Sequence, residues 1–104
     1  MVVHSNGGAL MLDRVVSRNK DVAWRIIENE AILISAEDSM LHSLDEVGTR
    51  IWELSDGSNT VEQIIDTIFD EYEVDRETAE KDVIEFVTNL ASEKLGLLIV
   101  SESA

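Results

Sequence analysis

The sequence predicts an α+β domain of winged-helix-like form, in which a three-stranded antiparallel β-sheet is followed by a three-helix bundle. The main observation is a change of hydrophobic period, from about two before residue 44 to about 3.6 after it. In addition, the 104 residues are 44% hydrophobic and contain no proline and no cysteine. We therefore expect one modest core without disulfides.

The first two strands form a predicted hairpin. Residues 22–27 alternate in a way typical of a strand with one face buried more deeply, and residues 31–35 form a second β-rich run. The polar turn at residues 28–30 joins them, with Asn29 suited to a left-handed backbone conformation.

A third short strand is predicted at residues 40–44, after the polar segment 36–39. Alternation places its side chains on two faces. One face carries Met40, His42 and Leu44, and the other carries Leu41 and Ser43.

Two helices should follow. Asp45 is a good N-cap, and the Asp-Gly pair at residues 56–57 should end the first helix in a tight turn, with Gly57 at positive φ. Thr60 and Gln63 form a predicted capping box for the second helix. The inner faces carry Val47, Ile51 and Leu54 in the first helix and Val61, Ile64, Ile65, Ile68 and Phe69 in the second.

A third, longer helix is predicted from a cap at Asp75 to about Lys94, with Gly96 stopping it. Residues 97–100 then form an extended apolar tail that can make a short strand. The inner face of the helix would be Ala79, Val83, Phe86, Val87 and Leu90. We expect all the aromatic side chains to pack in the core, with Trp52 at its margin.

The predicted domain covers residues 13–100. Residues 1–12 are interpreted as a flexible N-terminal arm, whose end could be tethered to the core by Leu10, Met11 and Leu12, and residues 101–104 as a C-terminal tail. No stretch is apolar enough to span a bilayer, and the first residues lack the features of a secretory signal, so a cytoplasmic protein without a membrane partner is expected.

Charge argues against nucleic acid as a partner. Acidic residues outnumber basic ones 22 to 8, and the formal net charge is −14. Because duplex affinity comes largely from Lys and Arg at phosphates, a helix-turn-helix DNA reader is disfavoured. A peptide or protein partner fits this composition better.

Motifs for catalysis are lacking, so no enzyme activity, cofactor or metal is expected. Gly7-Gly8 neither follows a strand nor opens a helix, and no serine lies in a nucleophile elbow. The histidines are His4 and His42, and the acids near His42 are no more than such an acidic chain places beside any residue.

Three segments together resemble the PqqD family, named for a protein of pyrroloquinoline quinone biosynthesis. They read DVAWRIIENEAILIS, LDEVGTRIWELSDGSNTVEQI and YEVDRETAEKDVIEFVTNL, and the similarity extends over about residues 13–100. Asp45 departs from the pattern, since many relatives have asparagine there; either residue caps a helix.

The resemblance implies a non-catalytic domain that binds the leader segment of a ribosomally made precursor peptide. It would present the leader to a radical S-adenosylmethionine (SAM) enzyme or a leader protease, and would be a monomer or homodimer. The leader would add as a strand to residues 40–44, in the cleft between that strand and the third helix. The implied peptide-binding residues are Met40, Leu41, His42, Ser43, Leu44, Ala79, Val83, Phe86, Val87 and Leu90. Two alternatives stay open: a general protein-interaction subunit, and a winged-helix DNA-binding regulator.

Overall fold

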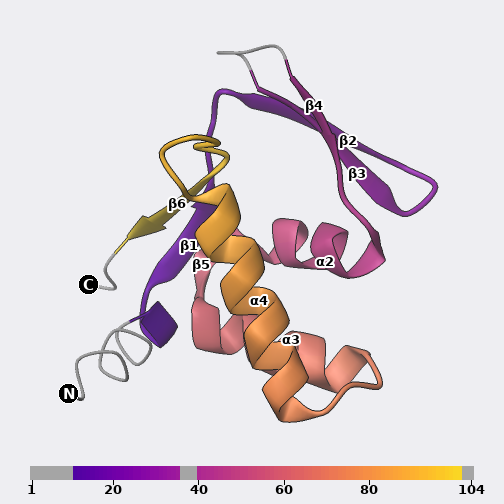
Figure 1. Ribbon diagram of the computed structural model, residues 1–104, viewed down its shortest axis with the longest axis vertical. Helices are drawn as coiled ribbons and strands as arrows, with labels where there is room; N and C mark the ends of the chain where they lie inside the picture. Colours follow the sequence, from indigo (N-terminus) through magenta and orange to yellow (C-terminus); the bar gives the residue numbers. More distant parts are fainter. Residues whose placement is uncertain (1–10, 36–39, 102–104) are drawn as a thin grey trace.

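The computed structural model describes residues 11–35 and 40–101, which form two three-stranded sheets and three helices (Figure 1). The predicted α+β order, a three-stranded antiparallel sheet followed by three helices, is confirmed. None of the helices in the described ranges is long and apolar enough to cross a membrane. In chain order the elements are β1 (Val15–Arg18), β2 (Val22–Ile27), β3 (Glu30–Ser35), β4 (Leu41–Ser43), α2 (Glu46–Leu54), β5 (Asp56–Thr60), α3 (Val61–Glu71), α4 (Arg76–Leu90) and β6 (Leu98–Ser101).

The predicted hairpin and third strand form one antiparallel sheet with the order β2-β3-β4. The two residues between β2 and β3, Glu28 and Asn29, both have positive φ, at 52° and 70°. Positive φ at both central positions matches the right-handed twist of the flanking strands. The left-handed conformation expected of Asn29 is therefore confirmed. The polar segment 36–39 lies outside the described residues.

The second sheet, with the order β5-β1-β6, was only partly predicted. The apolar tail forms β6 as expected, but β1 and β5 were missed. The tight turn predicted at the Asp-Gly pair of residues 56–57 is wrong, because both residues belong to β5, which pairs antiparallel with β1. Gly57 has the expected positive φ of 88° within this strand. The sequence DGSNT has no apolar alternation and no β-branched residue apart from Thr60. Sequence patterns therefore could not predict that this segment forms a strand.

The helix starts are confirmed. Asp45 and Asp75 cap α2 and α4, and Thr60 and Gln63 form the capping box of α3. The predicted end of α4 at about Lys94 is wrong, because the helix ends at Leu90. The chain turns back there: the Leu97 N–H donates to the Leu90 carbonyl at 2.8 Å, and Gly96 has a φ of 58°.

The core lies between the helices and the inner faces of both sheets. Trp52 is completely buried, so the expectation that it packs in the core is confirmed, although it is not marginal to the inner face of α2. The expectation that Trp24 and Phe69 pack in the core is wrong, since 39% and 40% of their surfaces are exposed. β2 is an edge strand of its sheet. Trp24 covers the core through an edge-on contact with Trp52, and the centres of the two rings are 6.0 Å apart. The largest fully buried side chains are Trp52, Leu33, Ile51, Ile64, Ile65, Ile68, Leu97, Val16, Val61, Val83 and Val87.

One threonine hydroxyl joins the β2-β3-β4 sheet to α2. The buried Thr49 Oγ1 accepts a hydrogen bond from the Ala31 N–H at 2.8 Å and donates one to the Leu44 carbonyl at 3.4 Å. Ala31 lies in β3 and Leu44 directly follows β4. The hydroxyl therefore supplies partners for backbone groups of both strands where they meet the helix.

The two sheets are joined by Arg18 at the end of β1. Its guanidinium donates to the carbonyls of Trp52 and Glu53, at 2.8 and 3.0 Å, in the last turn of α2. A cation there suits the negative end of the helix dipole. The same group lies 5.0 Å from the centre of the Trp24 ring in β2.

Replacing Thr49 with valine should destabilise the fold, because the buried Ala31 N–H loses its acceptor. We expect Thr49→Val to lower the free energy of unfolding by about 1–3 kcal/mol in urea titration. Hydrogen exchange of the Ala31 amide should accelerate. Thr49→Ser is the control, since it keeps the hydroxyl and should keep the Ala31 amide protected. Equal exchange of that amide in both variants would contradict this role.

The ion pair between α2 and α3 should make stability depend on pH. Arg50 donates two hydrogen bonds to the Glu71 carboxylate, at 2.8 and 2.9 Å, and lowers the pKa of Glu71 below its usual 4.5. The stabilisation is present above that pH and is lost as the pH falls through the lowered pKa. Because the pair is exposed, Glu71→Gln should cost only about 0.3–1 kcal/mol at pH 7. The deficit relative to the parent chain should vanish in acid; a deficit that is unchanged in acid would contradict this assignment.

Candidate functional site

The edge of the β2-β3-β4 sheet is formed by β4, one of the two elements predicted to form the site. Its ladder to β3 is bounded by two hydrogen bonds. The Leu44 N–H donates to the Ala31 carbonyl at 2.9 Å, and the Ser35 N–H donates to the Met40 carbonyl at 3.2 Å. The backbones of Leu44 and Met40 therefore face β3.

Antiparallel pairing alternates, so the backbone directions of the residues in between follow. His42, paired with Leu33, also directs its N–H and C=O toward β3. Leu41 and Ser43 direct theirs away from β3, toward the open edge. This edge presents two N–H groups and two carbonyls to any extended chain laid beside it.

The side chains of this strand divide between the two faces as predicted. His42 lies opposite the buried Leu33 on the inner face, and its Nε2 is buried without a hydrogen-bond partner in the described part of the chain. On the outer face, Leu41 is 62% exposed. Large apolar side chains of β2 and β3 share that face, since Ile27 and Ile34 are also exposed. The outer face thus carries an apolar patch.

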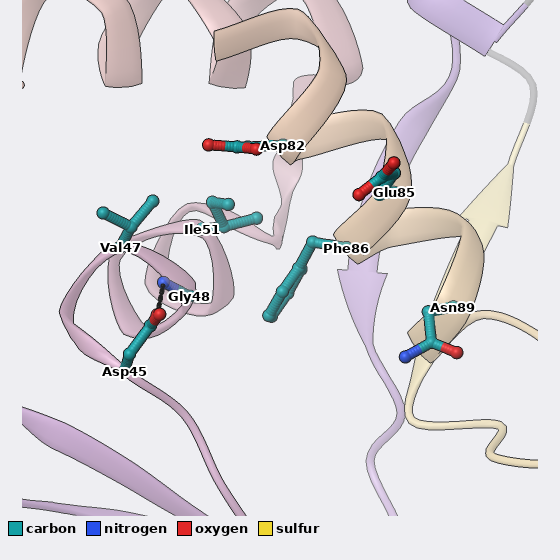
Figure 2. A pocket seen from close by; sticks show the side chains of 8 residues that line it. All are labelled: Asp45, Val47, Gly48, Ile51, Asp82, Glu85, Phe86 and Asn89. Carbon is teal, nitrogen blue, oxygen red and sulfur yellow. Dashed lines mark hydrogen bonds between the residues drawn. The ribbon is translucent and has the colours of Figure 1, made fainter. Parts of the chain in front are cut away.

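A pocket of about 410 Å³ lies just beyond the end of β4, between the first turns of α2 and the middle of α4 (Figure 2). Its lining residues come from these two helices and from the cap of α2. They are Asp45, Val47, Gly48, Ile51, Asp82, Glu85, Phe86 and Asn89.

Gly48 allows the two helices to approach at this pocket. Figure 2 shows the Phe86 ring pointing from α4 toward Gly48 in α2. A Cβ atom at position 48 would lie 3.0 Å from Phe86 Cε2 and 3.1 Å from Asp45 Oδ1. Glycine is therefore favoured here by close approach and not by its backbone angles, since a Cβ atom would make the Phe86 and Asp45 side chains shift slightly.

The pocket has an apolar floor and an acidic rim. Phe86, Val47 and Ile51 supply the apolar surface, while Asp82 and Glu85 are exposed on α4. No basic residue lines it. The remaining lining acid, Asp45, accepts a hydrogen bond from the Gly48 N–H at 2.8 Å as the N-cap of α2.

The predicted α4 residues do not all reach this site. Ala79, Val83, Val87 and Leu90 are buried in the core, and Phe86 alone of the five lines the pocket. Sequence reasoning missed the polar lining residues of α4. A second face of α4, adjacent to the apolar stripe, carries residues spaced by four and three positions, namely Asp82, Phe86 and Asn89. This spacing could have indicated from the sequence that the three side chains lie on one face of the helix.

A metal centre is not assembled here. In residues 11–35 and 40–101, no three histidine or carboxylate side chains are grouped so that they could hold a metal ion. What the site offers is a strand edge that no other described strand pairs, and, shortly after it in the chain, an apolar, acid-rimmed pocket. Such a combination suits an extended peptide.

The sequence and the fold are similar to those of known proteins. Residues 30–95 match the family described as coenzyme PQQ synthesis protein D (PqqD). A similar fold, with a TM-score of 0.69, occurs in the solved structure of TbiB1 in complex with the TbiA(beta) leader peptide. The two sequences are 35% identical, and the match covers 76% of this chain and 92% of that chain. A search among curated proteins found no significant match.

Two further structures share the fold at 18% identity. Lasso peptide synthetase B1 complexed with the leader peptide matches over 82% of this chain and 98% of that chain, with a TM-score of 0.71. The heterocyclase TruD matches over 84% of this chain but only 11% of that chain, with a TM-score of 0.59. At this identity the likeness concerns the fold alone.

Burial predicts different outcomes for two neighbouring positions of α4. Val83→Arg places a charge in the core and should cost more than about 4 kcal/mol, enough to unfold much of the protein. Phe86→Ala should leave a folded protein with an enlarged pocket, because the ring is only partly buried. Circular dichroism melts of both variants check this. A Val83→Arg variant that melts like the parent would contradict the described core.

Proposed function

This chain belongs to the PqqD family, and we propose that it is a non-catalytic peptide chaperone for the leader segment of a ribosomally synthesised precursor peptide. In this proposal the leader adds as a strand to the open edge of β4. The chain then presents the precursor to a modifying enzyme. The observation that carries the proposal is the edge at Leu41 and Ser43, which no other described strand pairs and which lies close in the chain to Asp45 of the pocket.

Strand addition fits the chemistry of this edge. Each outward N–H and C=O of Leu41 and Ser43 can pair with a backbone group of an extended peptide. Backbone pairing supplies affinity with little dependence on sequence. Selectivity must then come from side chains, and the pocket between α2 and α4 is the nearest place to receive one.

The 35% identical relative supports a leader peptide as the ligand, since its structure is a complex with one. The site proposed here is narrower than the predicted set. It comprises the β4 strand and the exposed face of α4 around Phe86, because Ala79, Val83, Val87 and Leu90 present no accessible side-chain surface.

Presentation to an enzyme would act through tethering. Holding the leader near the enzyme makes the second encounter intramolecular, at roughly millimolar effective concentration. The apolar outer face at Ile27, Ile34 and Leu41 supports contact with a second protein. We propose a radical SAM enzyme or a leader protease as that protein, in the cytoplasm, with the chain acting as a monomer or homodimer.

The DNA-binding alternative has little support in the geometry. The exposed face of α4 carries Glu77, Asp82 and Glu85. Its first residue, Arg76, is already bound to Asp66 at 2.6 Å. A helix with this surface would repel a phosphate backbone.

A titration followed by NMR tests the proposal. The probe is a synthetic leader of the precursor peptide encoded nearest the gene, added to the ¹⁵N-labelled chain. We expect shifts of the amides of residues 41–43 and of the α4 face from Asp82 to Asn89. Ser43→Pro removes one outward donor and should weaken binding about two- to tenfold, the value of one hydrogen bond.

Ile26→Pro is the matched control. Ile26 lies in β2, at the opposite edge of the same sheet, and alternation from the hairpin turn makes its N–H face outward as well. It should therefore leave leader affinity unchanged. Equal weakening by both prolines, or no shifts at high micromolar leader, would overturn the proposal.

A further inference from the structure

The open edge of β4 and the pocket between α2 and α4 are close together along the chain. Asp45, which lines the pocket and caps α2, follows Ser43 by only two residues. In the proposed binding mode, an extended chain paired with Leu41 and Ser43 would extend toward this pocket. The inference below rests on the proposed function and specifies which leader the site selects.

The pocket combines two kinds of surface that a peptide would meet together. Its floor is apolar and is formed by Val47, Ile51 and the ring of Phe86. Two carboxylates, from Asp82 and Glu85, lie on its α4 side. Neither carboxylate makes a hydrogen bond or an ion pair with another described residue. The ion pairs of the helices are formed by Glu53, Asp66, Glu71 and Glu80 instead.

The balance of charge at the pocket is negative. Asp45, Asp82 and Glu85 contribute three negative charges, and no lining residue is basic. The N-terminus of α2 opposes this with only about half a positive charge. That end of the helix is moreover already occupied, because the Gly48 N–H donates to Asp45.

The arrangement favours an organic cation over a metal ion. The carboxylates of the described residues are not grouped closely enough to hold a metal. A lysine or arginine side chain does not require such grouping, because it carries its charge on a long apolar stem. The stem can lie on the apolar floor while the charged end reaches the acidic rim.

We propose that the leader recognised by this chain carries an apolar anchor with a lysine or arginine beside it, the anchor on the Phe86 floor and the cation at Asp82 and Glu85. The site would thereby discriminate against acidic leaders. Like charges meeting at this rim would repel them.

Selection from a random peptide library tests this proposal without knowledge of the natural leader. A library of short random peptides displayed on their own messenger RNA is selected on the intact chain. The bound fraction is sequenced and compared with the input. We expect enrichment of sequences with Lys or Arg next to a large apolar residue, and depletion of Asp and Glu there.

Charge variants make the test specific to the pocket. The affinities of selected peptides are measured for Asp82→Asn/Glu85→Gln and for a control, Glu62→Gln/Glu77→Gln. Both variants change the net charge equally, but the control residues are exposed on α3 and α4 and do not line the pocket. The pocket variant should bind about two- to fivefold more weakly per carboxylate removed, and less so at high salt. The control should bind like the parent.

The outcomes separate the two proposals. Binders that weaken with Ser43→Pro but show no excess of Lys or Arg would overturn this inference and leave the peptide-binding function standing. Equal weakening by the pocket variant and the control would also overturn it, since the effect would then be one of net charge. A selection without any binder that depends on Ser43 would overturn both.

Discussion

The arrangement of the site depends on the Thr49 hydroxyl. It accepts from the Ala31 N–H and donates to the Leu44 carbonyl, and so fixes the ends of β3 and β4 on the first turn of α2. Both backbone groups would otherwise meet the helix without a partner, at a cost comparable to the stabilisation that one buried side chain provides. The position of the edge strand is thus set by a helix side chain and not by the sheet alone.

The first turn of α2 contributes to this arrangement through three consecutive tasks. Asp45 caps the helix, Gly48 leaves room for the Phe86 ring, and Thr49 binds the two strands. Because all three residues lie within five positions, a substitution at one of them changes the surroundings of the other two. A side chain at position 48 would press on both Phe86 and the capping carboxylate.

The sequence could predict what local chemistry decides. The hairpin turn, the three N-caps and most of each apolar stripe follow from a few neighbouring residues, and the structure contains them, apart from Phe69 and Phe86, which lie outside the buried core. It could not predict the pairing of β5 with β1, because DGSNT is polar and pairs with a distant segment through its backbone. Nor could it separate the two sides of α4. Val83 and Phe86 belong to the same apolar pattern in the sequence. The way α2 approaches α4 at Gly48 is what distinguishes them, because Val83 lies in the core and Phe86 lines the pocket.

The acidity of the chain matters for ligand choice because the strand edge and the surfaces beside it contribute differently to recognition. A strand edge recognises a peptide through backbone groups that every peptide possesses, so the edge alone distinguishes poorly among ligands. Discrimination has to be built into the surfaces beside it. The negative charge of α4 repels nucleic acid from a fold whose helix pairs resemble those of DNA readers. At the pocket, the same charge acts at short range on whichever side chain follows the paired strand. If the leader binds as proposed, the net charge of −14 of the whole sequence acts locally at the pocket on which extended peptide can remain bound.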